Sequence, residues 1–338
     1  MAALTKEYLV VIKITIIIIS STSSLYLVSS QGQLRVGFYA NSCPNAETIV
    51  RRVVSEAAAS DENTAPILLR LHFHDCFVQG CDGSILIEHD EANTEEERKA
   101  NGHQGVRGFE IIERAKSEVE AACPNIVSCA DIVALAARDA VLLAKGPSYE
   151  VETGRRDGLV SNVRMADDMP DVSDSIQTLK SKFFLKGLTH KDLVLLSAAH
   201  TIGTSACFFM EPRLYNFRGA PGISDPSINP VFLPELKSTC PQNGDVNVRL
   251  AMDRGSVHTF DKQILENIRG GFAVLQSDAT LYQDAATRRV VDSYFGALNP
   301  FLGPSFEADF AVSMVRLGRT GVLTGSQGTI RRVCKSFN

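Results

Sequence analysis

Apolar residues recur at the three- and four-residue spacing of α-helices along most of the chain. Residues 45–60 show this most clearly. Their apolar residues form a stripe along one side of a helix, and the charged residues Arg51, Arg52 and Glu56 lie on the opposite side. Residues 128–145 are apolar on several sides, which predicts a buried helix. The same spacing predicts further helices over residues 109–122, 174–184, 189–200, 261–269, 279–298 and 305–317. The chain is therefore predicted to be mainly α-helical, without internal repeats.

Two segments lack helical periodicity. Residues 88–105 are acidic and rich in asparagine, which predicts a surface loop. Residues 146–172 shift in composition to Gly, Pro, Arg and Asp. This shift predicts a long ordered loop near a functional site or between subdomains, and it is the best internal boundary in the chain.

The first 30 residues have the pattern of a secretory signal peptide, with lysines around an apolar run that ends in small residues. A transmembrane helix is the weaker interpretation, because Glu7 and Lys13 interrupt the run. We expect cleavage after Ser30. Residues 31–338 would then form one large domain of about 308 residues, or two halves that share a cleft.

The formal net charge of −5 becomes −6 when the predicted signal, with two Lys and one Glu, is removed. Since no basic block stands out, nucleic acid is not an expected partner. All eight cysteines follow the predicted signal, and an even number in a secreted protein predicts four disulfides. The sequence leaves about 105 pairings open. Proximity suggests only the pair Cys76 and Cys81.

The densest chemistry in the chain lies in residues 70–84, RLHFHDCFVQGCDGS, where charged, imidazole, thiol and carboxylate groups are crowded together. Thr64 and Pro66 precede this motif as a predicted N-cap and first-turn pair. The apolar run between Pro66 and the motif has no strand-like alternation. A helix is therefore predicted to carry the motif.

The spacing within this motif decides which side chains act together. On a helix, Arg70, Phe73 and His74 share one face, so a cation, an aromatic wall and a base line one pocket. His72 and Asp75 would point elsewhere. On a strand, His72 and His74 would share a face as a pair of zinc ligands, so a secreted zinc hydrolase stays open as an alternative. A purely structural role for His74 in the core is a further alternative.

A second histidine ends another predicted helix. Thr189 and Asp192 form a capping-box pattern at its start, and Gly203 follows its end. His200 lies at the apolar C-terminal end, where a structural histidine is more common than a ligand. However, a base beside an arginine on one helix and a lone imidazole ending another, in a secreted disulfide-bonded helical protein, is the arrangement that sandwiches a haem.

With these features, the chain resembles the class III plant secretory haem peroxidases over essentially its whole mature length. The resemblance implies a mainly helical fold in which distal and proximal halves sandwich a haem, with four disulfides. The motifs that carry it stand in the family order: residues 70–84 quoted above, 128–140 (SCADIVALAARDA), 154–158 (GRRDG), 192–203 (DLVLLSAAHTIG) and 276–278 (QSD).

The resemblance implies a role for each residue of the two histidine segments. His200 would be the proximal iron ligand, with Asp278 accepting a hydrogen bond from its other ring nitrogen. His74 would be the distal base, Arg70 the distal cation and Phe73 a wall of the haem pocket. The implied reaction is hydrogen-peroxide-dependent oxidation of phenolic donors, through a ferryl intermediate that two one-electron steps reduce. The implied cofactor is one non-covalent haem b.

The resemblance also implies two calcium ions, specific disulfides and a buried ion pair between Asp131 and Arg155. For the distal loop, a solvated Asp-rich run is the alternative. The implied calcium ligands are Asp75, Val78, Gly80, Asp82 and Ser84 at the distal site, and Thr201, Asp253, Ser256, Thr259 and Asp261 at the proximal site. The implied pairings are Cys43 with Cys123, Cys76 with Cys81, Cys129 with Cys334, and Cys207 with Cys240.

Some positions near the implied pocket depart from the family pattern. His103 lies where the family has an Asn that hydrogen-bonds the distal histidine. A neutral His103 could accept that bond, whereas a protonated one would oppose charge on His74. At the entrance for aromatic donors, Val172 follows Pro170 where many members have a second proline, which leaves donor preference open. Tyr149 stands where the family often has its one Trp.

Other departures concern metal content and modification. Ser256 and Lys262 differ from the usual residues of the proximal calcium site, so that site is less secure than the distal one. No Asn-x-Ser/Thr acceptor occurs, so N-glycosylation is not predicted. The signal peptide predicts an extracellular location in the apoplast or cell wall, and the resemblance implies a monomer. A non-catalytic secreted haem or calcium protein is the competing hypothesis.

Overall fold

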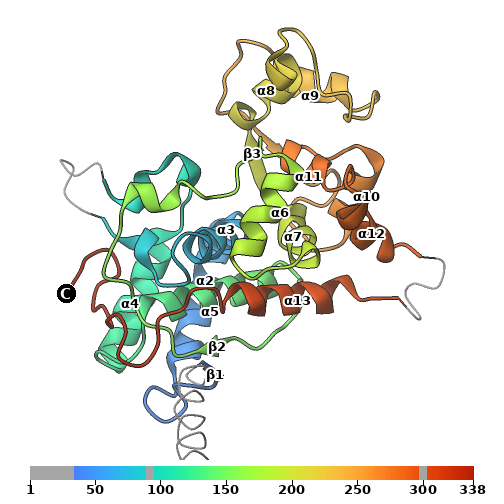
Figure 1. Cartoon of the computed structure of the whole chain (residues 1–338). Coiled ribbons are helices and arrows are strands. Elements are labelled where there is room, and N and C mark those ends of the chain that lie inside the picture. Colours follow the sequence, from blue (N-terminus) through green and yellow to red (C-terminus); the bar gives the residue numbers. More distant parts are fainter. Residues whose placement is uncertain (1–33, 89–94, 297–302) are drawn as a thin grey trace, which may run out of the picture.

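Helices dominate the chain, as its periodicity predicts, in the computed structural model (Figure 1). The structure describes residues 34–88, 95–296 and 303–338. The predicted signal peptide lies outside these residues. The α-helices are α2 (Ala46–Ser60), α3 (Thr64–Phe77), α4 (Phe109–Ala122), α5 (Cys129–Leu143), α6 (Ile176–Leu185), α7 (His190–Ser197), α8 (Glu211–Tyr215), α9 (Leu233–Thr239), α10 (Gln263–Gly270), α11 (Gln276–Thr280), α12 (Ala285–Ser293) and α13 (Phe306–Leu317).

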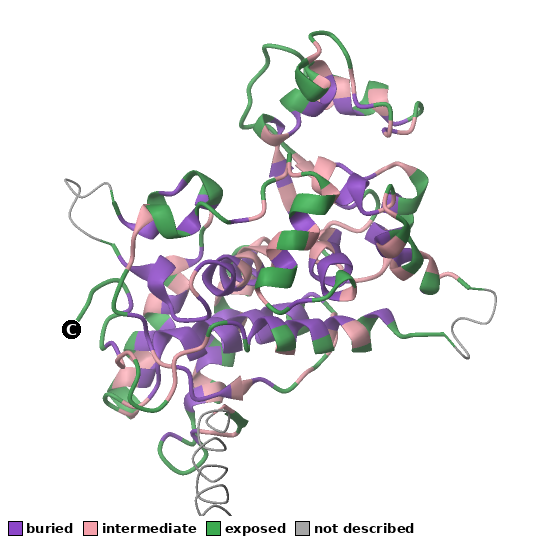
Figure 2. Ribbon diagram, viewed as in Figure 1, coloured by how far each residue is buried: buried purple, intermediate pink, exposed green. Residues whose placement is uncertain are grey.

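Helix α5 forms the centre of the larger hydrophobic core, and Figure 2 shows it buried along most of its length. Its apolar sequence requires this, because α2, α3 and α4 all pack against it. Ser128 caps its start by accepting a hydrogen bond from the backbone N–H of Asp131 at 3.1 Å. A smaller core around Met210, Leu214 and Phe232 supports α8 and α9 at the top of Figure 1.

Two small antiparallel sheets connect distant parts of the chain. Strand β1 (Arg35–Val36) pairs with β2 (Glu152–Thr153), and β3 (Thr204–Ala206) pairs with β4 (Arg249–Ala251). In the second sheet Thr204 lies opposite Ala251. The segment that directly follows His200 is therefore fixed by backbone pairing. None of the helices within the described residues is long and apolar enough to cross a membrane.

The four disulfide pairings implied by the resemblance are confirmed. The bond between Cys129 and Cys334 joins residues 205 positions apart and ties the C-terminal segment to the start of α5. The remaining bonds join Cys43 to Cys123, Cys76 to Cys81 and Cys207 to Cys240. No cysteine is free.

Some predicted helix boundaries are wrong. Thr64 is not the N-cap of α3 but its first residue, after Asn63, and its side chain is buried. The segment 189–200 is α-helical only as far as Ser197. It then tightens into the 3₁₀ turn η5 (Ala198–Thr201), which carries His200.

The segment predicted as one helix over residues 279–298 contains a break. Asp284 has an extended backbone and caps α12 by accepting hydrogen bonds from the N–H groups of Ala286 and Thr287, so α11 and α12 are separate. The last two residues of the predicted range lie outside the described residues.

The prediction of a surface loop over residues 88–105 is wrong for its second half. That half forms two 3₁₀ turns, η2 (Glu97–Lys99) and η3 (Asn101–His103), and it buries the side chains of Glu97 and His103. The loop over residues 146–172 is largely irregular, as predicted, apart from β2 and the 3₁₀ turn η4 (Val163–Ala166).

Candidate active site

Helix α3 presents a base and a cation on one face, as its spacing predicts. His74 is buried, and its Nδ1 lies 2.8 Å from Nδ1 of His103. Nη2 of Arg70 donates to the carbonyl oxygen of Gln104 at 3.0 Å. Across the described part of the chain, no carboxylate forms an ion pair with Arg70. The ring of Phe73 meets the imidazole of His74 edge-on, with 6.1 Å between the ring centroids.

The electrostatics of this face keep His74 neutral. Burial holds the pKa of His74 well below its usual range, and the positive charges of Arg70, His103 and His200 lower it further. Burial also lowers the pKa of Arg70 to about 10, with contributions from Arg249 and Arg107, and a guanidinium at this pKa stays charged near neutral pH. This face of α3 thus pairs a neutral imidazole with a cation that has no carboxylate partner in the described residues.

The second histidine is supported by a carboxylate from a distant segment. Nδ1 of His200, on η5, lies 3.0 Å from both carboxylate oxygens of Asp278, on α11. Asp278 is buried, whereas the side chain of His200 is 35% exposed. Burial alone would lower the pKa of His200, but the charge and hydrogen bond of Asp278 outweigh it, so the pKa is raised. The contact between His200 and Asp278 is the one that the resemblance implies.

The two histidine segments lie close together. Turn η5 packs against α3, and the charge of His200 is near enough to lower the pKa of His74. Figure 1 shows α3, α6 and α7 near the centre of the molecule, and α7 leads into η5. Two imidazoles from separate segments therefore lie in the same region of the molecule. One is backed by a carboxylate, and the other stands beside an arginine.

The strand-based zinc alternative is wrong, because the motif is helical and its two histidines diverge. His72 points toward Cys76, with Nδ1 3.6 Å from the sulfur, whereas His74 points to His103. Burial lowers the pKa of His72 to about 3. Within the described residues, no group of three or more His, Cys, Asp or Glu side chains is arranged to bind zinc.

The distal loop presents oxygen atoms with no partner among the described residues. Oδ1 of Asp75 accepts a hydrogen bond from the N–H of Gly83 at 2.7 Å, but Oδ2 is buried and unpaired, as is Oγ of Ser84. Burial raises the pKa of Asp75 well above its usual range and that of Asp82 to about 6. The donor set and the unpaired buried oxygens fit a hard cation such as calcium.

The side chains implied for the proximal calcium also lie together. Oγ1 of Thr201 donates to Oδ2 of Asp253 at 2.8 Å. The hydroxyl of Ser256 lies within hydrogen-bond distance of a carboxylate oxygen of Asp261 and of the carbonyl oxygen of Thr259. Burial raises the pKa of Asp253 to about 7. These oxygens fit calcium as a donor set, although they are already hydrogen-bonded to one another.

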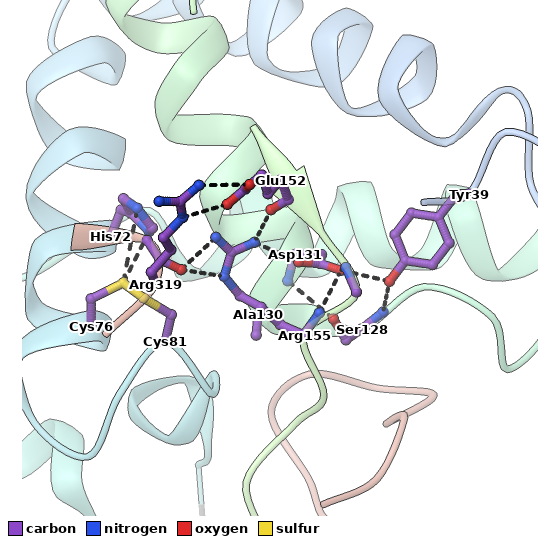
Figure 3. Close-up of polar contacts among 12 residues, drawn as sticks. Tyr39, His72, Cys76, Cys81, Ser128, Ala130, Asp131, Glu152, Arg155 and Arg319 are labelled. Atoms are coloured by element: carbon purple, nitrogen blue, oxygen red, sulfur yellow. Dashed lines mark hydrogen bonds and ion pairs between the residues drawn. A yellow bond between two sulfur atoms is a disulfide. The ribbon is translucent and has the colours of Figure 1, made fainter. Parts of the chain in front are cut away.

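The buried ion pair between Asp131 and Arg155 is confirmed, and it is structural (Figure 3). Nη1 of Arg155 lies 2.7 Å from Oδ1 of Asp131. Oδ2 of Asp131 accepts from the hydroxyl of Tyr39 and the N–H of Gly154, both at 2.7 Å. The pair joins α5 to the segment that follows strand β2.

The predicted donor-entrance residues follow Met169, which contacts the 3₁₀ turn η3 that carries His103. Pro170 and Val172 are partly buried, and Val172 packs against the smaller core. The preceding Met169 is buried against Gly102, where an added Cβ would meet the Met169 Cβ at 3.0 Å. Since Gly102 directly precedes His103, the loop at 169–172 and the distal segment are in contact.

The sequence did not point to Glu97, which the structure places behind His103. Oε1 of Glu97 lies 3.3 Å from Nε2 of His103. Glu97 belongs to an acidic run at residues 95–97 that is typical of a solvated surface, so only its burial reveals the contact.

Comparisons with known proteins agree with this geometry. A sequence model of the peroxidase family matches residues 50–297. Peroxidase 43 of Arabidopsis thaliana is 66% identical over 309 residues, which cover 91% of this chain and 94% of that protein. Peroxidase 13 of the same plant is 55% identical, covering 91% and 94%. Peroxidase N1 of Nicotiana tabacum is 48% identical, covering 92% of each chain.

Proposed function

The chain belongs to the peroxidase family and is a haem enzyme that catalyses hydrogen-peroxide-dependent oxidation, and we propose that Arg70, His74 and His200 carry out this reaction. The observation that carries the proposal is the difference between the surroundings of the two imidazoles. His200 has a buried carboxylate at Nδ1, whereas His74 is neutral and stands beside an arginine without an ion-pair partner in the described residues. His200 is thereby suited to bind the haem iron, and His74 is suited to transfer protons.

On the proximal side, His200 would hold the haem iron through Nε2. An ionised Asp278 can only accept hydrogen bonds, so Nδ1 of His200 carries the proton and Nε2 offers its lone pair. The buried carboxylate makes the imidazole more basic and fixes its orientation. The haem, when bound, supplies the redox chemistry by accepting two oxidising equivalents from peroxide and returning them to donors one at a time.

On the distal side, His74 acts as general base and then as general acid. Its neutral Nε2 takes a proton from one oxygen of hydrogen peroxide and returns it to the departing oxygen, which leaves as water. The guanidinium of Arg70 stabilises the negative charge that develops on that oxygen. Burial of His74 keeps it available as a base, and Phe73 would wall the haem edge.

We propose two calcium sites that hold the two histidine segments in place. The distal ion would be bound by Asp75, Val78, Gly80, Asp82 and Ser84, directly after His74 in the chain. The buried, unpaired oxygens of Asp75 and Ser84 support this assignment. The proximal ion would be bound by Thr201, Asp253, Ser256, Thr259 and Asp261, directly after His200.

The cofactor is proposed to be one haem b without a covalent bond to the chain, since all eight cysteines are paired and no thiol is free to attach it. The donors are proposed to be small phenols that enter past Pro170 and Val172. The disulfides and the predicted signal peptide support secretion to the apoplast or cell wall. We further propose a monomer with a role in cell-wall or defence-related phenol oxidation and peroxide removal.

The test is the absorption spectrum of the mature protein, loaded with haem and calcium, after one equivalent of hydrogen peroxide. Wild-type protein should change its spectrum rapidly. His74→Ala should slow this change by about 10²- to 10⁴-fold, because the base is removed. His190→Ala is the matched control, since His190 is an exposed histidine at the start of α7.

The outcomes separate the competing functions. Loss of the rapid change in His74→Ala with intact haem binding supports the proposal. Equal rates in His74→Ala and wild type would contradict His74 as the base. Haem binding without any response to peroxide in the wild type would favour a non-catalytic haem protein.

A further inference from the structure

A buried arginine holds the backbone that leads into α11, the helix of Asp278. The side chain of Arg213, on α8, is only 1% exposed. Its Nη1 donates to the carbonyl oxygens of both Ala273 and Val274, which lie 60 and 61 positions further along the chain. The next residue, Leu275, is the N-cap of α11. The guanidinium therefore binds the segment from which α11 starts.

The guanidinium is itself fixed from other sides. Nε of Arg213 donates to Oδ2 of Asp225 at 2.8 Å, and the side chain of Asp225 is also only 1% exposed. Oδ1 of Asp225 accepts from the N–H of Ser227 at 2.8 Å, and the N–H of Asp225 donates to the carbonyl oxygen of Arg213 at 2.9 Å. Because a planar guanidinium presents its donors in a fixed geometry, these bonds give the carbonyl oxygens of Ala273 and Val274 one defined position.

Helix α11 cannot fix the position of Asp278 by itself. It has five residues, too few for a helix that is stable on its own, and its N-cap makes no side-chain hydrogen bond. Val274 and Leu275 also pack in the smaller core, but apolar packing is non-directional. Within the described residues, only Nδ1 of His200 donates to the Asp278 carboxylate. The orientation of Asp278 therefore depends on how the backbone before α11 is held.

The charges of Arg213 and Asp278 are close enough to interact. Burial lowers the pKa of Arg213, and the negative charges of Asp225 and Asp278 partly oppose this. The buried cation and the carboxylate behind His200 thus lie in the same region, and Asp225 is the ion-pair partner that keeps the cation in place.

We propose that Arg213 is a positioning residue for the peroxide reaction, and that it holds the backbone before α11 so that Asp278 is presented to Nδ1 of His200. This inference rests on the proposed role of His200 as the iron ligand. The partner behind a ligating histidine sets the orientation and the basicity of its ring. A displacement of Asp278 would therefore reach the iron through His200.

The first test is Arg213→Lys in the protein loaded with haem and calcium. Lysine keeps the positive charge, but one ammonium group cannot reproduce the fork that joins Asp225 to two carbonyl oxygens. Resonance Raman spectroscopy of the reduced protein measures the iron–histidine stretching frequency, which falls when the hydrogen bond from Nδ1 of the histidine weakens. We expect the frequency to fall toward that of Asp278→Asn, and the peroxide-dependent spectral change to slow by about 10-fold.

Leu236→Ala is the matched control for a general loss of stability. Leu236 is buried in the same smaller core, and its truncation should destabilise that core without moving the iron–histidine frequency. Equal shifts in Arg213→Lys and Leu236→Ala would overturn the inference, because loosening of the core would then be sufficient.

A milder variant covers the case in which Arg213→Lys does not fold. Asp225→Asn keeps an acceptor for Nε of Arg213 but removes the charge that anchors the guanidinium. We expect a fall of the iron–histidine frequency in the same direction, smaller than that of Asp278→Asn. A frequency equal to that of wild type would count against the inference.

A double-mutant comparison shows whether Arg213 acts through Asp278. In an Asp278→Asn background, Arg213→Lys should cause no further fall of the iron–histidine frequency, whereas the same fall in both backgrounds would overturn the inference. If Asp278→Asn lowers the frequency and Arg213→Lys does not, only this inference fails. If the wild type shows no iron–histidine band, or His200→Ala retains it, the proposed role of His200 fails.

Discussion

Nδ1 of His200 lies 3.0 Å from both carboxylate oxygens of Asp278, although 78 positions separate the two residues. The buried negative charge of Asp278 therefore lies next to Nδ1 of His200. Burial makes this charge effective, because Asp278 is only 1% exposed and water does not screen it. The pair therefore fixes both the tautomer and the basicity of His200.

The first prediction follows from this pair. Asp278→Asn keeps the size of the side chain but removes its charge, so His200 should become a weaker electron donor to the iron. We expect haem binding to persist and the peroxide-dependent spectral change to slow by about 10- to 100-fold. Stopped-flow absorption measures the rate. Ser277→Ala on the same helix is the control, and an Asp278→Asn protein as fast as this control would contradict the role of the pair.

The sequence predicted the pair between His200 and Asp278 only through the family resemblance, since nothing local links residues 200 and 278. Helix periodicity, in contrast, was sufficient for α2 and α4, because each has an apolar stripe along its length, and the length of the apolar run was sufficient for α5. Helices α8 and α9 were missed. They contain five and seven residues, too few for a period to appear.

The burial of Glu97 next to His103 could not be predicted from the sequence. An acidic run is normally solvated, and the burial of this one depends on packing against a segment more than sixty residues away. Oγ of Ser161 accepts from the N–H of Glu97, and the N–H of Val163 donates to the carbonyl of Glu95 at 2.7 Å. Only tertiary structure brings these segments together, so no local pattern could have assigned Glu97 to the site.

The second prediction concerns the stability of the scaffold. Arg155→Ala would leave Asp131 as a buried charge without its ion-pair partner, and we expect it to lower the free energy of unfolding by about 3–5 kcal/mol. Arg319→Ala is the matched control. Arg319 pairs with Glu152 in the same region (Figure 3), but its side chain is 56% exposed, so we expect a loss below about 1 kcal/mol. Denaturant unfolding measures the free energy of unfolding of both variants. Equal losses would show that the buried ion pair contributes no more stability than the exposed one.

The third prediction is that calcium removal destabilises the protein through the distal loop. An ion that binds only the folded state stabilises it in proportion to the logarithm of its concentration over its dissociation constant, by about 2.7 kcal/mol at a hundredfold excess. A chelator should therefore lower the melting temperature of wild type. In Asp75→Asn this calcium-dependent shift should be smaller, whereas in the exposed control Asp61→Asn it should be unchanged. A full shift in Asp75→Asn would place the bound calcium elsewhere.

The fourth prediction concerns the capping box that starts α7, the helix leading to His200. Asp192 accepts from the N–H of Thr189 at 2.8 Å and from the hydroxyl of Ser313 at 2.7 Å, and Arg316 lies 3.1 Å away. Burial alone would raise the pKa of Asp192, but these hydrogen bonds and the arginine outweigh it and lower the pKa. The ionised carboxylate is thus stabilised more in the folded state than in the unfolded state.

We expect Asp192→Ala to lower the free energy of unfolding by about 1–3 kcal/mol near neutral pH. Because the folded-state pKa lies below the unfolded value of about 4, the contribution of Asp192 is fully present above pH 4 and is lost as the pH falls through the folded-state pKa. The difference between wild type and Asp192→Ala should therefore shrink below pH 4. Thr189→Ser keeps the capping hydroxyl and should retain the pH dependence of wild type. A difference independent of pH would mean that Asp192 stabilises α7 by packing rather than by its charge.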